Sequence, residues 1–162
     1  MPEIKLDTDG FAYLRICAYR KGTAIPIPEF LYYKVDSGAN STTIGKDDLN
    51  RLGYDDAFIK TGKLLVGKER PTVATGEPID NCYKFIIPEV RIGIWKGSCW
   101  SFLVSMNNNV QFKLLFGTDS MRFFNWEFDY ERNVCIYNAI NGKKLVIHDN
   151  IEQSIHSIDD VH

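Results

Sequence analysis

The chain has 162 residues, of which 44% are hydrophobic and 25% are charged, and its formal net charge is −2. This composition is typical of a single globular domain with enough apolar side chains for a sizeable core. The lysines and arginines are scattered and form no sustained basic face, so we expect no nucleic acid among its partners.

The N-terminal segment from Met1 to Asp7 lacks an apolar stretch long enough for a signal peptide. No later run approaches the ~18 apolar residues that a membrane span needs. We therefore expect a cytoplasmic location and no association with a membrane.

The four cysteines lie far apart within apolar segments, without the paired spacing of zinc or thioredoxin sites. The sequence therefore predicts no metal site and four reduced thiols in the core. These cysteines are Cys17, Cys82, Cys99 and Cys135.

The first part of the chain is predicted to form strands with one short helix. Aromatic and aliphatic residues predict strands over 11–19 and 30–35. A helix is predicted over 46–53, because acidic residues open it, Leu49 and Leu52 share a face, and Gly53 can end it.

From residue 60 onward, short apolar runs alternate with glycine and proline, which is the spacing of an all-β domain. A short helix capped by Thr118 or Asp119 is expected after the most apolar of these runs. The remaining residues, 148–162, form a polar, acidic tail. Strands are predicted over 64–66, 83–87, 90–94, 100–104, 112–116 and 144–147, and a hairpin over 126–130 and 134–137.

Asp36 follows an apolar strand and precedes Ser37 and Gly38, so one carboxylate stands on a tight turn. Such a tripeptide occurs by chance in roughly one in ten chains of this length, and an ordinary strand-ending turn is the simple alternative. Hydrolysis of a peptide by carboxyl groups needs two of them around one water, one ionised and one protonated. The chain has no second Asp-Ser-Gly or Asp-Thr-Gly, so a pair of this kind requires two chains that meet at a two-fold axis.

Two motifs resemble those of the retropepsins, the single-domain aspartic proteases, including their bacterial relatives. The first is Val35–Ala39 with the polar and β-branched stretch Asn40–Ile44. The second is Leu114–Gly117, which is similar to the hydrophobic-hydrophobic-glycine element of that family. The resemblance implies an all-β fold, a closed β-barrel with one or two short helices, over residues 1–147, followed by the tail.

The resemblance assigns Asp36 as the catalytic residue and Ser37, Gly38 and Ala39 as the active-site turn. The Ser37 hydroxyl would link the two turns across the dimer, and Gly38 would present its backbone N–H to the carboxyl groups. A glycine-containing hairpin over 70–77 is expected to be the flap that closes over the substrate. The residues expected to bind substrate are Asn40, Ile44, Val73, Thr75, Gly76, Leu115 and Phe116.

Two positions depart from the viral members of the family. Ser37 stands where threonine is usual, which keeps the hydroxyl and loses a methyl group. Thr118 stands where many members have an arginine that is ion-paired near the active-site turn. Hydrogen bonds from Asp119 and Asn40 are the expected replacement.

These observations predict an aspartic endopeptidase that acts as a symmetric homodimer on an extended peptide or protein, with no metal or organic cofactor. A second carboxylate from the same chain is disfavoured, because Asp119 is expected to cap a helix and Asp129 to face solvent. The alternative from another class is a non-catalytic peptide- or protein-binding module on the same fold.

Overall fold

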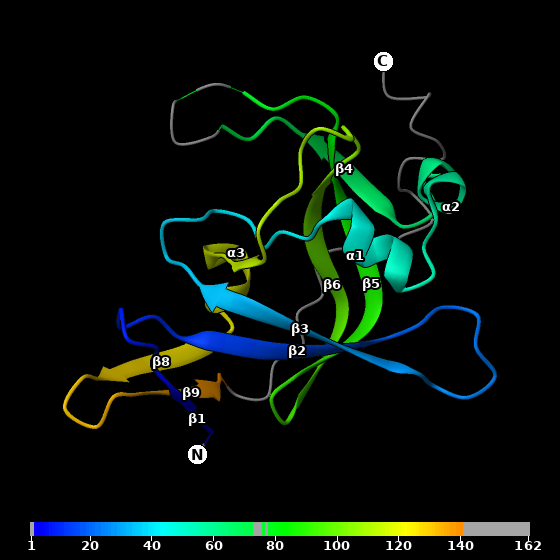
Figure 1. The fold of residues 1–162 in the computed structure, drawn as a ribbon. Helices are drawn as coiled ribbons and strands as arrows, with labels where there is room; N and C mark the ends of the chain where they lie inside the picture. Colours follow the sequence, from blue (N-terminus) through cyan, green and yellow to red (C-terminus); the bar gives the residue numbers. More distant parts are fainter. Residues whose placement is uncertain (1, 73–75, 77, 141–162) are drawn as a thin grey trace.

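The computed structural model describes residues 2–72, 76 and 78–140. Strands predominate in this part of the chain and form two sheets (Figure 1). The strands are β1 (Glu3–Lys5), β2 (Tyr13–Tyr19), β3 (Pro28–Val35), β4 (Leu65–Glu69), β5 (Cys82–Ile92), β6 (Trp95–Ser105), β7 (Leu115–Phe116), β8 (Phe124–Asp129) and β9 (Val134–Ala139). The helices are α1 (Lys46–Arg51), α2 (Asp56–Lys60) and α3 (Thr118–Met121).

The larger sheet has the strand order β4-β5-β2-β3-β7, and β6 pairs with β5. Its neighbours are antiparallel except β3 and β7, which are parallel. The smaller sheet is antiparallel and has the order β1-β9-β8. The predicted mostly-β class is confirmed. Among the described residues both sheets are open, so the closed barrel stays a prediction.

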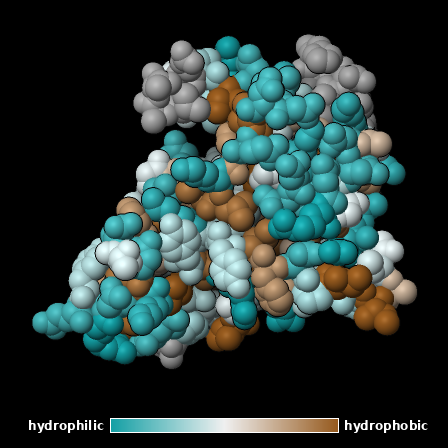
Figure 2. Space-filling view, viewed as in Figure 1, coloured by the Kyte–Doolittle hydropathy of each residue, from teal (hydrophilic) through white to brown (hydrophobic). Residues whose placement is uncertain are grey.

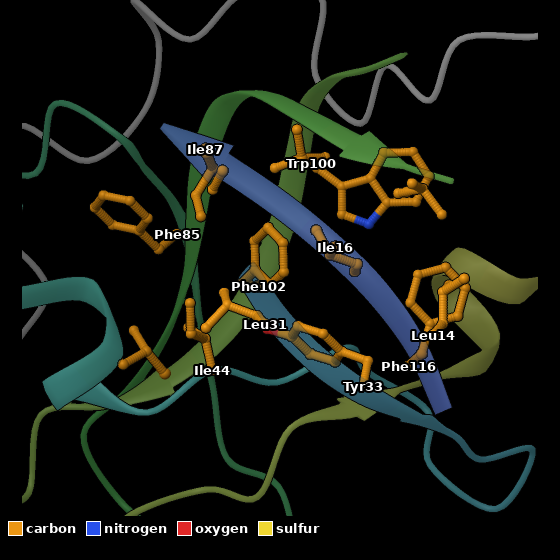
Figure 3. Packing of buried hydrophobic residues seen from close by; sticks show 14 of the residues in the cluster. Leu14, Ile16, Leu31, Tyr33, Ile44, Phe85, Ile87, Trp100, Phe102 and Phe116 are labelled. Carbon is orange, nitrogen blue, oxygen red and sulfur yellow. The ribbon is translucent and has the colours of Figure 1, made fainter. Parts of the chain in front are cut away.

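One hydrophobic core lies between the strands. Alternate side chains of β2 and β3 point inward, so Leu14, Ile16, Leu31 and Tyr33 are buried. The ring of Phe102, from β6, lies among these residues in Figure 3 and its centroid is 6.0 Å from that of Tyr33. Each fully buried side chain of this size stabilises the fold by roughly 1.5–3 kcal/mol. The strand that ends at the candidate site is therefore anchored along its inner face.

Most predicted elements are present, with their ends shifted by a few residues. Strands β2 and β3, helix α1 and the β8–β9 hairpin confirm the predictions for those segments. Helix α2 was not predicted, because its five residues are too few to show a helical period. Its start is fixed instead by Asp55, whose side chain accepts a hydrogen bond from the backbone N–H of Phe58 at 2.7 Å. The predicted strand over 144–147 and the tail lie outside the described residues.

Strand β5 runs through Pro88, where two separate strands were predicted. Pro88 stands opposite Cys99 between regular pairs of β5 and β6, and these two residues are not themselves paired. On the other side, β5 pairs with β4 before Pro88 and with β2 after it. The missing N–H of the proline therefore interrupts no established pair, which explains why one strand continues through it.

Candidate active site

Asp36 stands at the carboxyl end of β3, the strand between β2 and β7. Val35 before it is buried, whereas Asp36 is half-buried and Ser37 is exposed. The backbone N–H of Asp36 donates to the carbonyl oxygen of Phe116 at 3.0 Å, which extends the parallel pairing of β3 with β7. The backbone of the aspartate is thus bound directly to the second sequence motif.

The turn after Asp36 is closed by its own amides. The N–H of Gly38 donates to Asp36 Oδ1 at 2.9 Å, and the N–H of Ala39 donates to the Asp36 carbonyl oxygen at 3.1 Å. Across the described residues no lysine or arginine forms an ion pair with this carboxylate. Asp36 is therefore oriented by a backbone donor and is not neutralised by a neighbouring cation.

The second motif passes the turn at close range. The N–H of Thr118 donates to the Ala39 carbonyl oxygen at 2.9 Å, and the N–H of Gly117 donates to Thr42 Oγ1 at 3.1 Å. A Cβ atom at Gly117 would lie 2.6 to 2.8 Å from backbone atoms of Ser41 and Ala39. Only glycine permits this approach. The two motifs found in the sequence therefore meet in space, as the resemblance implied.

Thr42 is the centre of a buried hydrogen-bond network that the sequence did not reveal. Its backbone N–H and its hydroxyl both donate to Asp119 Oδ1, at 2.9 and 2.8 Å. Thr42 Oγ1 also lies 2.6 Å from Ser120 Oγ, and Trp100 Nε1 donates to that serine oxygen at 2.9 Å. Since the Thr42 proton points to Asp119, the serine hydroxyl is the donor to Thr42. The run of hydroxyl residues Ser41, Thr42 and Thr43 was the signal available in the sequence.

The capping role predicted for Thr118 or Asp119 is wrong. The N-cap of α3 is Gly117, and no side chain hydrogen-bonds to the cap. The Asp119 carboxylate binds Thr42 instead, so it does join α3 to the segment after the active-site turn, but through Thr42 and not Asn40. Asn40 is exposed.

Thr43 makes a second connection between the two motifs. Its N–H donates to the carbonyl oxygen of Leu115 at 3.0 Å, and its hydroxyl accepts from the N–H of Leu115 at 3.0 Å. The same hydroxyl donates to the carbonyl oxygen of Lys113. The next residue, Ile44, donates its N–H to the carbonyl oxygen of Leu103 in β6 at 2.9 Å. The segment after Asp36 is therefore bound to β7 on one side and to β6 on the other.

The residues expected to bind substrate are not equivalent in the structure. Ile44 and Phe116 are 0% exposed and belong to the core, so in this chain neither side chain is accessible to a substrate. Leu115 is half-buried and Asn40 is exposed at the turn. Gly76 is exposed with a φ of +86°. The remaining two, Val73 and Thr75, lie outside the described residues.

A hairpin is present where the flap was expected. Strands β4 and β5 form its arms, and beyond them Thr72 bridges to Pro78. The N–H of Ile79 donates to the Pro71 carbonyl oxygen at 2.8 Å. In Figure 1 these arms extend on the same side of the molecule as the loop after β3, and Figure 2 shows hydrophobic residues at the surface between them. The position of the hairpin matches the expectation, and its role as a flap stays a prediction.

The described part of the chain contains no group of three or more His, Cys, Asp or Glu residues that could hold a metal ion. It also contains no helix of the length and apolarity that crossing a membrane requires. None of the four cysteines is in a disulfide; Cys82 and Cys135 are buried, and Cys17 and Cys99 are partly exposed.

Comparison with known proteins gives one kind of match. No family model matches the chain, and no curated protein matches it. Among solved structures, it is similar to a retropepsin-like aspartic protease from Rickettsia conorii, with a TM-score of 0.56 and 20% sequence identity. The match covers 85% of this chain and 89% of that protein. At this identity the likeness establishes the fold, which is that of a retropepsin-like aspartic protease.

Proposed function

We propose that this chain is an aspartic endopeptidase that acts as a symmetric homodimer, in which each chain contributes one catalytic residue, Asp36. The observation that carries the proposal is the joining of the Asp36 turn to the Leu114–Gly117 motif. Two backbone N–H groups bind the turn itself, those of Asp36, which donates to Phe116, and Thr118, which donates to Ala39, and the N–H of Gly117 donates to Thr42 just beyond the turn. An ordinary strand-ending turn does not require a second, distant segment to hold it.

In the proposed reaction, the two Asp36 carboxyl groups share one proton across the two-fold axis, because two adjacent carboxylates repel each other. The ionised group removes a proton from a water molecule, which attacks the carbonyl carbon of the scissile peptide bond. The protonated group donates its hydrogen to the carbonyl oxygen. When the tetrahedral intermediate breaks down, the C–N bond is cleaved and the leaving nitrogen takes up a proton, which releases an amine and a carboxylic acid.

The proposed substrate is an extended peptide or protein segment between the β4–β5 hairpin and the Asp36 turn. An extended chain can pair with exposed backbone groups as an added strand, so most of its recognition would be independent of side chains. Asn40 and Leu115 are the described residues that we propose beside this path, and Val73, Thr75 and Gly76 would cover it. Ile44 and Phe116 are left out, because both are buried.

The test is the variant Asp36→Asn, compared with Asp47→Asn as a matched control. Asp47 is an exposed acid in the first turn of α1, so the same chemical change there leaves the candidate site untouched. Cleavage of a proteome-derived peptide mixture is measured by mass spectrometry, and folding by urea unfolding. We expect Asp36→Asn to lose at least ~100-fold in rate with normal folding, and the control to keep its rate.

Undiminished cleavage by Asp36→Asn would remove the proposal. A wild-type dimer that binds peptides from the mixture but cleaves none would instead favour the non-catalytic binding module. Because a protease with a single cognate substrate would also leave a small peptide mixture intact, the mixture is made from whole-proteome digests with several different enzymes.

A further inference from the structure

The structure has a cavity of about 340 Å³ that Asp36 does not line. Its walls come from β1, β2, β3, β5 and β9, on the outward side of β2. Tyr13, Arg15 and Cys17 alternate along β2 with the core residues Leu14 and Ile16, so they face away from the core. The cavity is therefore separate from the candidate active site.

The charges that line this cavity are mostly positive. Lys5, Arg15 and Arg91 contribute three cations, and Glu3 is the one acid among the lining residues. Glu3 Oε1 lies 2.9 Å from a guanidinium nitrogen of Arg132, so its charge is already compensated. Among the described residues neither Arg15 nor Arg91 has a carboxylate partner. A chain with a net charge of −2 thus has a locally positive cavity.

The register of the strands brings the two arginines together. Arg91 of β5 pairs with Cys17 of β2, and Arg15 is two residues away on the same face. Both guanidinium groups act on the Cys17 thiol, although burial outweighs them and raises its pKa. The thiol is therefore uncharged at neutral pH and does not compensate either arginine. Arg15 and Arg91 therefore share one face of the sheet beside Cys17, and no carboxylate of the described residues pairs with either.

Aromatic side chains form the apolar part of the same cavity. The guanidinium carbon of Arg15 lies 4.8 Å from the centroid of the Phe30 ring, a cation–π contact that restricts the side chain. Phe30 is 46% exposed and Tyr13 is 44% exposed, which is a large apolar area to leave in water. Tyr137, from β9, closes the cavity on the side of the smaller sheet.

We propose that this cavity binds a small organic anion, with a carboxylate or phosphate group between Arg15 and Arg91 and an apolar or aromatic body against Phe30 and Tyr13. The planar forks of two guanidinium groups match the oxygens of carboxylates and phosphates. An anion in this position also removes the repulsion between the two cations, which a neutral guest would not do. The proposal is independent of catalysis by Asp36.

The experiment is calorimetric titration of the full chain with four probes. 3-Phenylpropionate and phenyl phosphate are the anions with an aromatic body. 3-Phenylpropanol keeps the body without the charge, and inorganic phosphate keeps the charge without the body. We expect both aromatic anions to bind, and each control to bind at least ~10-fold more weakly. The tighter of the two anions identifies the preferred headgroup.

Variants locate the binding. Arg15→Gln and Arg91→Gln should each lower the affinity for the aromatic anions by ~10-fold or more, because each removes one charged hydrogen-bond donor from an exposed position. Lys68→Gln is the matched control, since it removes one exposed positive charge of β4 that is not in the cavity. Asp36→Asn should bind as the wild type does. This last result distinguishes failure of the present proposal from failure of the proposed protease function.

Three outcomes would overturn the proposal. The first is that the aromatic anions do not bind at about 10 mM, and the second is that the alcohol binds as tightly as they do. The third is that both arginine variants bind the aromatic anions as tightly as Lys68→Gln does. Thermal unfolding of every variant is recorded alongside. If one arginine variant is destabilised, the other still tests the site.

Discussion

Asp119 Oδ1 accepts two hydrogen bonds from Thr42, one from the backbone N–H at 2.9 Å and one from the hydroxyl at 2.8 Å. The two residues are 77 positions apart, and the hydroxyl also accepts from the backbone N–H of Gly117. One threonine side chain therefore fixes the segment after the Asp36 turn to the start of α3. Its removal should affect both motifs together.

We predict that Thr42→Val destabilises the fold by about 2 to 4 kcal/mol. Valine has nearly the same shape, but it leaves the buried N–H of Gly117 and the hydroxyl of Ser120 without their partner. Urea unfolding measures the loss. The control is Thr23→Val, since the Thr23 hydroxyl is exposed and donates one bond of 3.3 Å to the Arg20 carbonyl oxygen. A change of less than about 0.5 kcal/mol at both positions would contradict the role of the network.

We predict that Gly117→Ala is destabilising by about 1 to 3 kcal/mol and displaces the Asp36 turn. The φ angle of Gly117 is −86°, which any residue can adopt, so the penalty is steric. The added methyl group would meet backbone atoms of Ser41 and Ala39, which cannot rotate away as a side chain can. In Gly117→Ala, both the rate of peptide cleavage and the free energy of unfolding should therefore decrease. Gly67→Ala is the matched control, because its added methyl group would have no atom within 4 Å.

Much of this site could be predicted from the sequence, because its two motifs are local patterns. An apolar strand followed by Asp36-Ser37-Gly38 specifies a carboxylate on a turn, and the apolar run before Gly117 specifies the strand beside it. Their meeting in space came from the resemblance. The network around Thr42 could not be predicted, since a threonine hydroxyl has donors and acceptors for many different partners and sequence gives no distance between them.

The core explains why two residues that were predicted to bind substrate, Ile44 and Phe116, do not reach the surface. Ile44 and Phe116 belong to the two active-site motifs, and this position in the sequence suggested that they form pocket walls. Alternation along a strand decides the face on which a side chain lies, however, and Phe116 points into the aromatic cluster with Trp100 and Phe124. The predicted end of a strand at Pro88 was wrong for a related reason. Strand β5 continues through the proline because neighbouring strands pair with it on both sides, and the sequence of the segment alone does not show that pairing.

We predict that Asp36→Asn chains lower the activity of wild-type chains when the two are mixed. If a site needs Asp36 from both chains, a 1:1 mixture of wild type and Asp36→Asn should have about a quarter of the activity of wild type at the same total concentration. Chains that act alone would keep about half. The chains are mixed at low concentration and then concentrated, so that they exchange partners before the assay. A mixture of wild type with Asp47→Asn should keep full activity.

We predict that the free energy of unfolding decreases as the pH rises from about 9 to 11, in part because of Cys135. Burial raises the pKa of this thiol from its ordinary value of 9.0 to about 11. In that range the unfolded chain loses the Cys135 proton while the folded chain keeps it, so ionisation favours unfolding. Urea unfolding at pH 8 and 10.5 measures the decrease, which should be smaller in Cys135→Ala. Equal decreases would show that Cys135 does not contribute. Burial also raises the pKa of Tyr137, and the charge of Cys135 adds to that rise, so the difference between wild type and variant includes the effect of Cys135 on this tyrosine.

Strand β5 pairs with β4 before Pro88 and with β2 after it, and β2 in turn pairs with β3, which ends at Val35, directly before Asp36. The arms of the β4–β5 hairpin and the backbone of Asp36 are thus connected through a frame of paired strands. The connection from the hairpin to Asp36 passes along β5, beyond its unpaired position at Pro88, and then across β2 to β3. We expect the stiffness of that frame to set how far the hairpin arms can lift while the aspartate stays in place.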